Sequence, residues 1–271
     1  MLDAFLDMWS YEFMIRAFVI GTLVSICAAL VGLPLVLKRC SMIGDGLSHV
    51  AFGALALAIA LHMLPLTLAA PVVMISAFFL LKIADSERFS GDAAIAMVSA
   101  SALALGITAV SMSEGFNTDA QNYLFGTILA MSNESFWTGI VLCFGVMGLY
   151  ALLYQRLMAI TFDGAFAKAM GLPVERLRST LAIMSAAVIV TGMHLMGALL
   201  ISSLLVFPAM TAMRLCARYF TTVVTAIVVG VVALWMGLIA SYLWNVPAGA
   251  GIVLANAILF ILASLVRLIR H

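Results

Sequence analysis

Long apolar segments separated by short polar ones make up most of this chain. Each is close to the ~20 residues that a helix needs to cross a bilayer. We expect nine crossings, with eight or ten as alternatives, at about 14–37, 46–64, 66–83, 93–112, 134–155, 179–196, 197–215, 220–244 and 249–267. A further apolar piece, 123–131, is too short to span and predicts an interfacial or re-entrant helix. The pattern therefore predicts an all-α, polytopic membrane protein.

The composition supports this class. The chain of 271 residues is 65% hydrophobic and 9% charged, whereas soluble domains average ~45–50% and ~25%. A net charge of +1 gives no basic field that would favour nucleic acid. No polar stretch is long enough for a soluble domain, so 1–271 is expected to be one transmembrane domain whose first apolar segment is a retained span. The four cysteines lack metal-ligand spacing and are expected to be packing residues.

Basic residues predict the orientation, because Lys and Arg near span ends stay on the cytoplasmic side. If the N-terminus lies outside, twelve of the thirteen basic residues face the cytoplasm, and Arg16 is the exception. The C-terminus is then cytoplasmic, which requires an odd number of crossings. The twelve are Lys38, Arg39, Lys82, Arg88, Arg156, Lys168, Arg176, Arg178, Arg214, Arg218, Arg267 and Arg270.

The longest predicted cytoplasmic stretch is 156–178. Within it Phe162, Phe166 and Met170 recur at helical spacing before Gly171 ends the pattern. One interpretation is a connector lying on the membrane surface. The other is a docking helix for a motor subunit. The chain has no GxxxxGK[ST] phosphate loop, so its energy must come from an ion gradient or from a separate subunit.

The residues with the clearest chemistry are Asp45 and His49 in the second segment. Four residues apart, they share one face of a helix. Counted as helix from Arg39, His49 lies ~15 Å into the membrane. Intramembrane ionisable residues usually face a pathway, and a carboxylate with an imidazole suits zinc, manganese or ferrous iron. The alternative is a helix N-cap at Asp45, with His49 bonded to a carbonyl.

Other features have ordinary explanations. Small residues such as Gly44, Gly46 and Gly53 would let another helix approach closely. Pro208 is expected to kink or end its helix. His62 and His194 are expected near outer span ends as interfacial side chains.

Five blocks in order carry a resemblance: GDGLSHVAFGALALA, YLFGTILAMS, TFDGAFAKAMGL, MGALLISSLLVFPAMTAMRL and NVPAGAGIVL. Together they resemble the permease subunits of bacterial zinc and manganese ABC importers. The resemblance implies a type II ABC importer-like fold, a homodimer in the bacterial inner membrane, cytoplasmic ATPase subunits and an extracytoplasmic metal-binding protein. It also implicates Asp45 and His49 in metal passage, and 161–173 as the cytoplasmic coupling helix that docks the ATPase. Thr127 stands where related permeases often carry an acidic residue.

The sequence therefore predicts a permease that moves a divalent transition metal, zinc first, by alternating access driven by a partner ATPase. It is expected to be no enzyme and to hold no permanent cofactor. One rival is a secondary transporter, in which Asp45 and His49 relay protons. The other is an intramembrane metalloenzyme, which needs at least three protein ligands and a general base.

Overall fold

The computed structural model describes residues 11–61, 63, 65–84, 91–112, 133–244 and 246–270. Within these ranges every regular element is a helix. The helices are α2 (Glu12–Leu37), α3 (Ile43–Ala60), α4 (Pro65–Ala84), α5 (Gly91–Met112), α7 (Asn133–Phe162), α8 (Gly164–Ala169), α9 (Val174–Met196), α10 (Ala198–Leu215), α11 (Tyr219–Trp244) and α12 (Ala248–Arg270).

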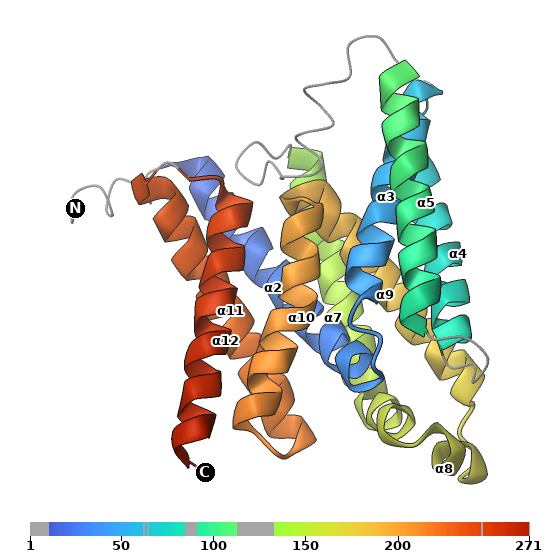
Figure 1. Cartoon of the computed structure of the whole chain (residues 1–271), viewed down its shortest axis with the longest axis vertical. Coiled ribbons are helices and arrows are strands. Elements are labelled where there is room, and N and C mark those ends of the chain that lie inside the picture. Colours follow the sequence, from blue (N-terminus) through green and yellow to red (C-terminus); the bar gives the residue numbers. More distant parts are fainter. Residues whose placement is uncertain are drawn as a thin grey trace.

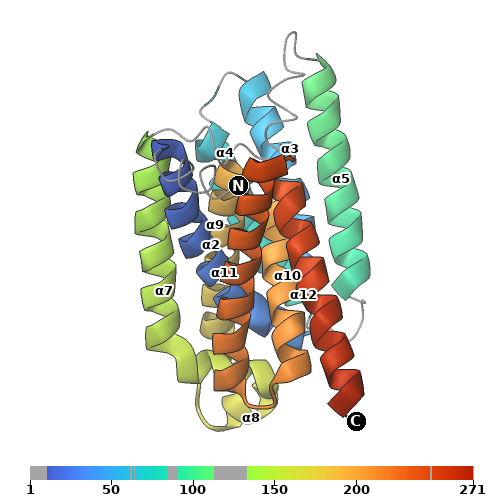
Figure 2. The same cartoon turned by 90° about the vertical axis from the view of Figure 1, so that its left-hand side faces the viewer.

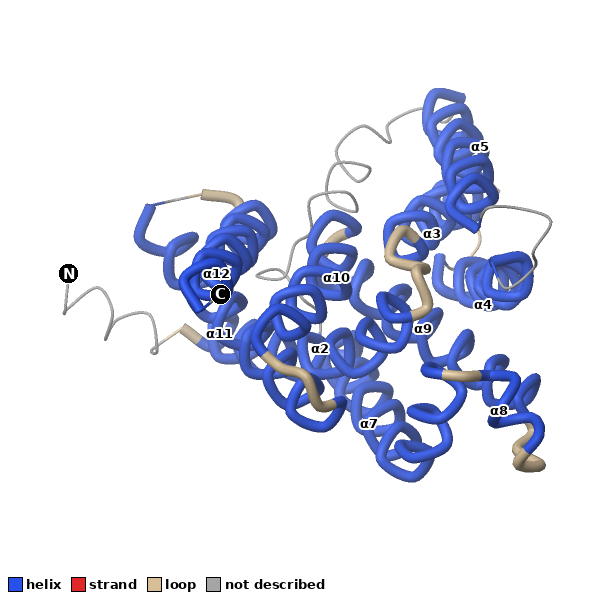
Figure 3. Tube along the Cα trace, turned by 60° about the horizontal axis from the view of Figure 1, so that its bottom comes forward, coloured by secondary structure: helices blue, strands red, loops and turns tan. Residues whose placement is uncertain are grey.

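The long helices run up and down along one axis (Figures 1 and 2). Helix α2 lies centrally and packs against α7, α9, α10 and α11. Figure 3 shows α11 and α12 on one side of this centre and α3, α4 and α5 on the other. Helix α2 begins at one end of the bundle, and α12 stops at the opposite end, the end at which α8 also lies (Figure 1).

Nearly all described basic residues lie at the α8 end of the bundle, which we call the basic end (Figure 1). Among the described residues, six helices are long and apolar enough to cross a membrane: α2, α7, α9, α10, α11 and α12. Helices α3, α4 and α5 carry shorter apolar stretches, Ile43–Ala58, Leu68–Ile83 and Ala93–Ala109. The predicted segments thus correspond to helices, but the count of nine crossings remains a prediction. The piece 123–131 lies outside the described residues.

Small residues bring α3 and α5 into backbone contact. A Cβ placed on Gly53 would lie 2.5 Å from the carbonyl oxygen of Ala102. A Cβ on Gly106 would lie 2.9 Å from Gly53 Cα. Such distances leave no room for any side chain, as at other close helix crossings in membranes. The expectation for Gly53 is confirmed, and the crossing holds the helix that carries Asp45 against α5.

Two local features refine the expected boundaries. Helix α10 does not end at Pro208 but continues through it to Leu215, so of the two expected effects of Pro208 only a kink stays a prediction. Helix α2 ends at Leu37, as expected, and a turn in which Arg39 has a φ of 60° leads to α3, which starts at Ile43 rather than at about 46.

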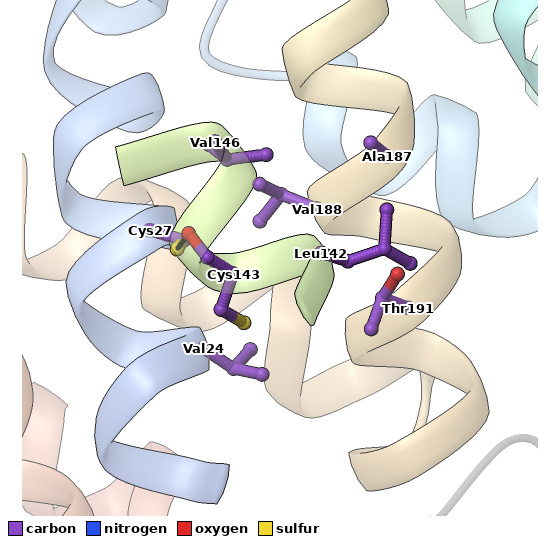
Figure 4. Close-up of a pocket in the computed structure, with 8 residues that line it drawn as sticks. All are labelled: Val24, Cys27, Leu142, Cys143, Val146, Ala187, Val188 and Thr191. Atoms are coloured by element: carbon purple, nitrogen blue, oxygen red, sulfur yellow. Dashed lines mark hydrogen bonds between the residues drawn. The ribbon is translucent and has the colours of Figure 1, made fainter. Parts of the chain in front are cut away.

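Cys27 and Cys143 are free thiols on neighbouring helices. Cys27 on α2 directs its Sγ to the carbonyl oxygen of Cys143 on α7, at 3.4 Å. Both line a small apolar cavity between α2, α7 and α9 (Figure 4). Their surroundings are those of packing residues, as expected. The cavity is lined by Val24, Cys27, Leu142, Cys143, Val146, Ala187, Val188 and Thr191.

Candidate functional site

Asp45 and His49 lie in the first two turns of α3. Asp45 Oδ2 and His49 Nε2 are 3.6 Å apart, so the predicted pair is formed. The side chains are 51% and 25% exposed, respectively, in a helix whose neighbouring residues are mostly buried. The pair is therefore accessible within an otherwise tightly packed part of the bundle.

The neighbouring glycines show where the pair points. A Cβ on Gly44 would lie 2.9 Å from Leu205 Cδ1 on α10. A Cβ on Gly46 would lie 2.6 Å from Ile95 Cγ2 on α5. Because successive helical residues are rotated by about 100°, Asp45 points midway between α10 and α5. The half-exposed carboxylate thus opens onto the face of the molecule between these two helices.

The spacing of the pair suits a shared cation. Zinc bonds of about 2.0–2.2 Å at a tetrahedral angle place two ligand atoms about 3.4 Å apart. The observed 3.6 Å needs only a small side-chain adjustment. His49 Nδ1 is buried and has no hydrogen-bond partner in the described part of the chain. The imidazole is therefore not committed through that nitrogen to a neighbouring carbonyl, as the alternative interpretation required.

The N-cap interpretation of Asp45 is also wrong in its register. Asp45 is the third residue of α3, which begins at Ile43. The backbone N–H of Gly46 donates to the carbonyl of Met42 at 2.9 Å, so the helical hydrogen bonds already begin before Asp45. A first-turn carboxylate still stabilises the helix by about 0.3–1 kcal/mol through the helix dipole. Stabilisation of α3 is therefore the alternative to a ligand role for Asp45.

Six residues separate His49 from Ile43, the first residue of α3, which is about 9 Å along a helix. Asp45 and His49 therefore lie in the first half of α3, the half that the turn at Arg39 joins to α2.

In the described part of the chain, other potential ligands do not gather with the pair. Among the described residues, no group of three His, Cys, Asp or Glu side chains is positioned to hold a metal ion. His194 lies far from α3 in sequence, at the end of α9, with Nε2 3.4 Å from Ser135 Oγ. His62 lies outside the described residues, as does Thr127.

The predicted coupling helix is shorter than 161–173. Helix α7 continues to Phe162 and α8 covers only Gly164–Ala169. Asp163 separates them: its backbone is extended, and its Oδ1 accepts a hydrogen bond from the Phe166 N–H at 2.9 Å. Aspartate is a favoured N-cap, and this is why one continuous helix does not form. Sequence reasoning missed Asp163, although an Asp just before a helical repeat is a recognisable cap signal.

The end of α8 is fixed by Gly171, as predicted. Its φ is +81°, and its N–H donates to the carbonyl of Lys168 at 3.0 Å. The Leu172 N–H donates to the Ala167 carbonyl at 3.1 Å. These two bonds form a Schellman motif, which requires a left-handed residue at the position of Gly171.

The predicted apolar anchors are all open to contact. Phe162, Phe166 and Met170 are 64%, 62% and 69% exposed. Phe162 also packs edge-on against Tyr219 of α11, with ring centroids 5.7 Å apart. The Tyr219 hydroxyl is 2.9 Å from that of Tyr150. The segment from Asp163 to Pro173, together with Phe162, is called the docking segment below.

The helices are those of a polytopic membrane protein, and comparison with known proteins gives its family. Residues 10–267 match the ABC 3 transport family. The chain belongs to this family.

Relatives match over nearly their full length. The manganese transport system membrane protein MntC of Listeria monocytogenes is 30% identical over 94% of this chain and 91% of its own. The high-affinity zinc uptake system membrane protein ZnuB of Haemophilus influenzae is 30% identical over 95% and 98%. The solved structure of PsaBC from Streptococcus pneumoniae in complex with Fab has a TM-score of 0.86 at 30% identity, covering 97% of this chain and 95% of that one. The chain is thus an ABC-type membrane permease.

Proposed function

We propose that this chain is the permease of an importer that moves a divalent transition metal into the cytoplasm. The observation that carries the proposal is the Asp45–His49 pair, 3.6 Å apart and open to the face between α5 and α10. An oxygen and a nitrogen donor at this spacing can hold a transition metal. No apolar packing role explains two adjacent ionisable groups there.

Zinc is our first candidate and manganese the second. Similar permeases are named as parts of manganese transport and zinc uptake systems. Imidazole suits zinc, and carboxylate oxygen also suits manganese. Iron remains a third candidate on the same donor chemistry.

We place the basic end in the cytoplasm, with the N-terminus outside, because Lys and Arg near span ends are retained there. The docking segment then faces an ATPase subunit, for which its exposed apolar side chains are the contact. A homodimer, with an extracytoplasmic metal-binding protein delivering the ion, completes the proposed importer. The chain's own role is passage by alternating access, without catalysis.

Two protein ligands suit passage better than storage. A closed site with four protein ligands binds zinc tightly enough to stabilise a fold. Asp45 and His49 leave coordination positions for water or for groups of a second protomer, so the ion can exchange. A secondary transporter would use the same pair for protons, but membership of an ABC family favours ATP as the energy source.

Metal rescue tests the proposal. Cells lacking the chain are grown with a chelator, and zinc, manganese or iron is added back singly. At low metal we expect growth only in cells that carry the intact gene. In cells that lack the gene, an excess of one metal should restore growth. Uptake of that metal into cells should also stop when ATP is depleted while the ion gradients are clamped. Uptake that continues under this condition would favour the secondary transporter.

A further inference from the structure

A second cavity lies at the basic end, between the ends of α10 and α12. It has a volume of about 400 Å³. Two of its lining side chains, Arg214 and Arg267, are cationic, and its wall is otherwise largely apolar. The cavity is lined by Met213, Arg214, Leu215, Cys216, Ala217, Val266 and Arg267.

Neither arginine is neutralised by the described residues. The described ion pairs involve Arg16, Arg178 and His49, not these two side chains. Arg214 instead has its guanidinium carbon 5.7 Å from the centre of the Phe260 ring on α12. This cation–π contact holds the guanidinium at the cavity without using its charge on an anion.

Two unneutralised guanidinium groups around one cavity favour an anion. Guanidinium forks match the oxygens of phosphate, and such bonds are among the strongest in proteins. The position of the cavity, at the ends of two bilayer-length helices, places it at a membrane–water boundary. Met213, Leu215 and Val266 offer apolar surface beside the charges, which suits a molecule with both a phosphate and acyl chains.

We propose that Arg214 and Arg267 form a binding site for the phosphodiester group of an anionic phospholipid. Basic pockets between transmembrane helices on the cytoplasmic side are suited to such head groups. One phosphate bonded to both arginines would tie the end of α10 to the end of α12. Because α10 also contacts α3 beside Gly44, the lipid braces a helix that borders the Asp45–His49 pair. The lipid site itself does not depend on which ion is transported.

The test measures lipid retention by the purified permease. The protein is exchanged from detergent into phosphatidylglycerol or phosphatidylcholine, and bound lipid is counted by native mass spectrometry. We expect phosphatidylglycerol to be retained in preference to phosphatidylcholine. The double variant R214Q/R267Q should weaken this retention by about tenfold or more for each arginine, since hydrogen bonds to charged groups contribute that much. R214K/R267K, which keeps both charges, should retain an intermediate amount.

Arg156, an exposed arginine at the same end of α7, provides the control. R156Q removes one charge outside the cavity and should leave retention unchanged. Equal retention by wild type and R214Q/R267Q, with both monodisperse, would overturn the proposal. So would an equal loss in R156Q, because any surface charge would then suffice. Displacement of the lipid by millimolar inorganic phosphate would show a site for free phosphate, which also contradicts a lipid site.

Discussion

The Asp45–His49 pair and the docking segment differ from their surroundings in opposite ways. The pair places ionisable groups in the apolar helix α3, whose other residues near them are buried. The docking segment places three large apolar side chains, each more than 60% exposed, at the end that carries the basic residues. Both arrangements cost free energy in an isolated chain. Residues that lie in an environment unusual for their type thus mark the two candidate binding sites. We expect a polar or charged ligand at α3 and an apolar protein surface at α8.

The largest effect is expected at the pair. His49→Gln keeps a hydrogen-bonding side chain but removes imidazole coordination. Losing even an outer-shell partner typically costs 10–100-fold, so metal uptake should fall by at least ~100-fold. Uptake assays on membranes with matched permease content check this. The ATPase should still bind, because the docking segment is intact; loss of both together would show misfolding instead.

The next largest effect is expected at the close crossing of α3 and α5. Gly53→Val would force side-chain atoms into Ala102, whose carbonyl oxygen is 2.5 Å from the Cβ position. Overpacking of this kind costs about 1–3 kcal/mol, and α3 and α5 must separate. Thermal unfolding in detergent measures the loss. The matched control is Gly145→Val, since nothing lies within 4 Å of its Cβ position; equal destabilisation of both variants would contradict the close crossing.

On the docking side, Gly171→Val tests the left-handed turn. A φ of +81° costs a β-branched residue about 1–2 kcal/mol, so the Schellman motif should open and the α8 anchors should shift. We expect weaker ATPase binding and more ATP hydrolysed per ion moved, while permease content is unchanged. Gly171→Asn is the control, because Asn tolerates this conformation. Normal coupling in the valine variant would argue against docking through this segment.

The smallest effect concerns the support behind the docking segment. Tyr150→Phe removes the hydrogen bond to the Tyr219 hydroxyl and leaves that group without this partner. The expected loss is about 1 kcal/mol of unfolding free energy, with little change in transport. Tyr154→Phe serves as the comparison, since its ring packs against Tyr219 but no described hydrogen bond uses its hydroxyl. If both variants unfold alike, the Tyr150–Tyr219 bond contributes nothing measurable.

Hydrophobic segments predicted the helices well because burial in lipid imposes length and composition directly. The predicted 220–244, for example, is helix α11 at Tyr219–Trp244. Local chemistry limited the rest. The cap at Asp163 separates α8 from α7 within the predicted 161–173 helix, because a few local hydrogen bonds outweigh continued periodicity. The i,i+4 spacing placed Asp45 beside His49 correctly.

Tertiary relations were beyond the sequence. Nothing in the spacing of Arg214 and Arg267 brings them to one cavity, because their meeting depends on how α10 packs against α12. Nor did the sequence alone place Phe162 against Tyr219 of α11. Such contacts join residues more than 50 positions apart and arise only when the bundle is assembled.

The most direct test of the central claim is metal uptake by Asp45→Asn in vesicles containing permease, ATPase and metal-binding protein. Asparagine keeps the size of the side chain but removes the charge. If Asp45 ligates the ion, uptake should collapse while the folded permease and its ATPase complex persist. If Asp45 only interacts with the helix dipole, the change costs no more than about 0.3–1 kcal/mol of stability and uptake stays near normal. Near-normal uptake by this variant would contradict the ligand role of Asp45.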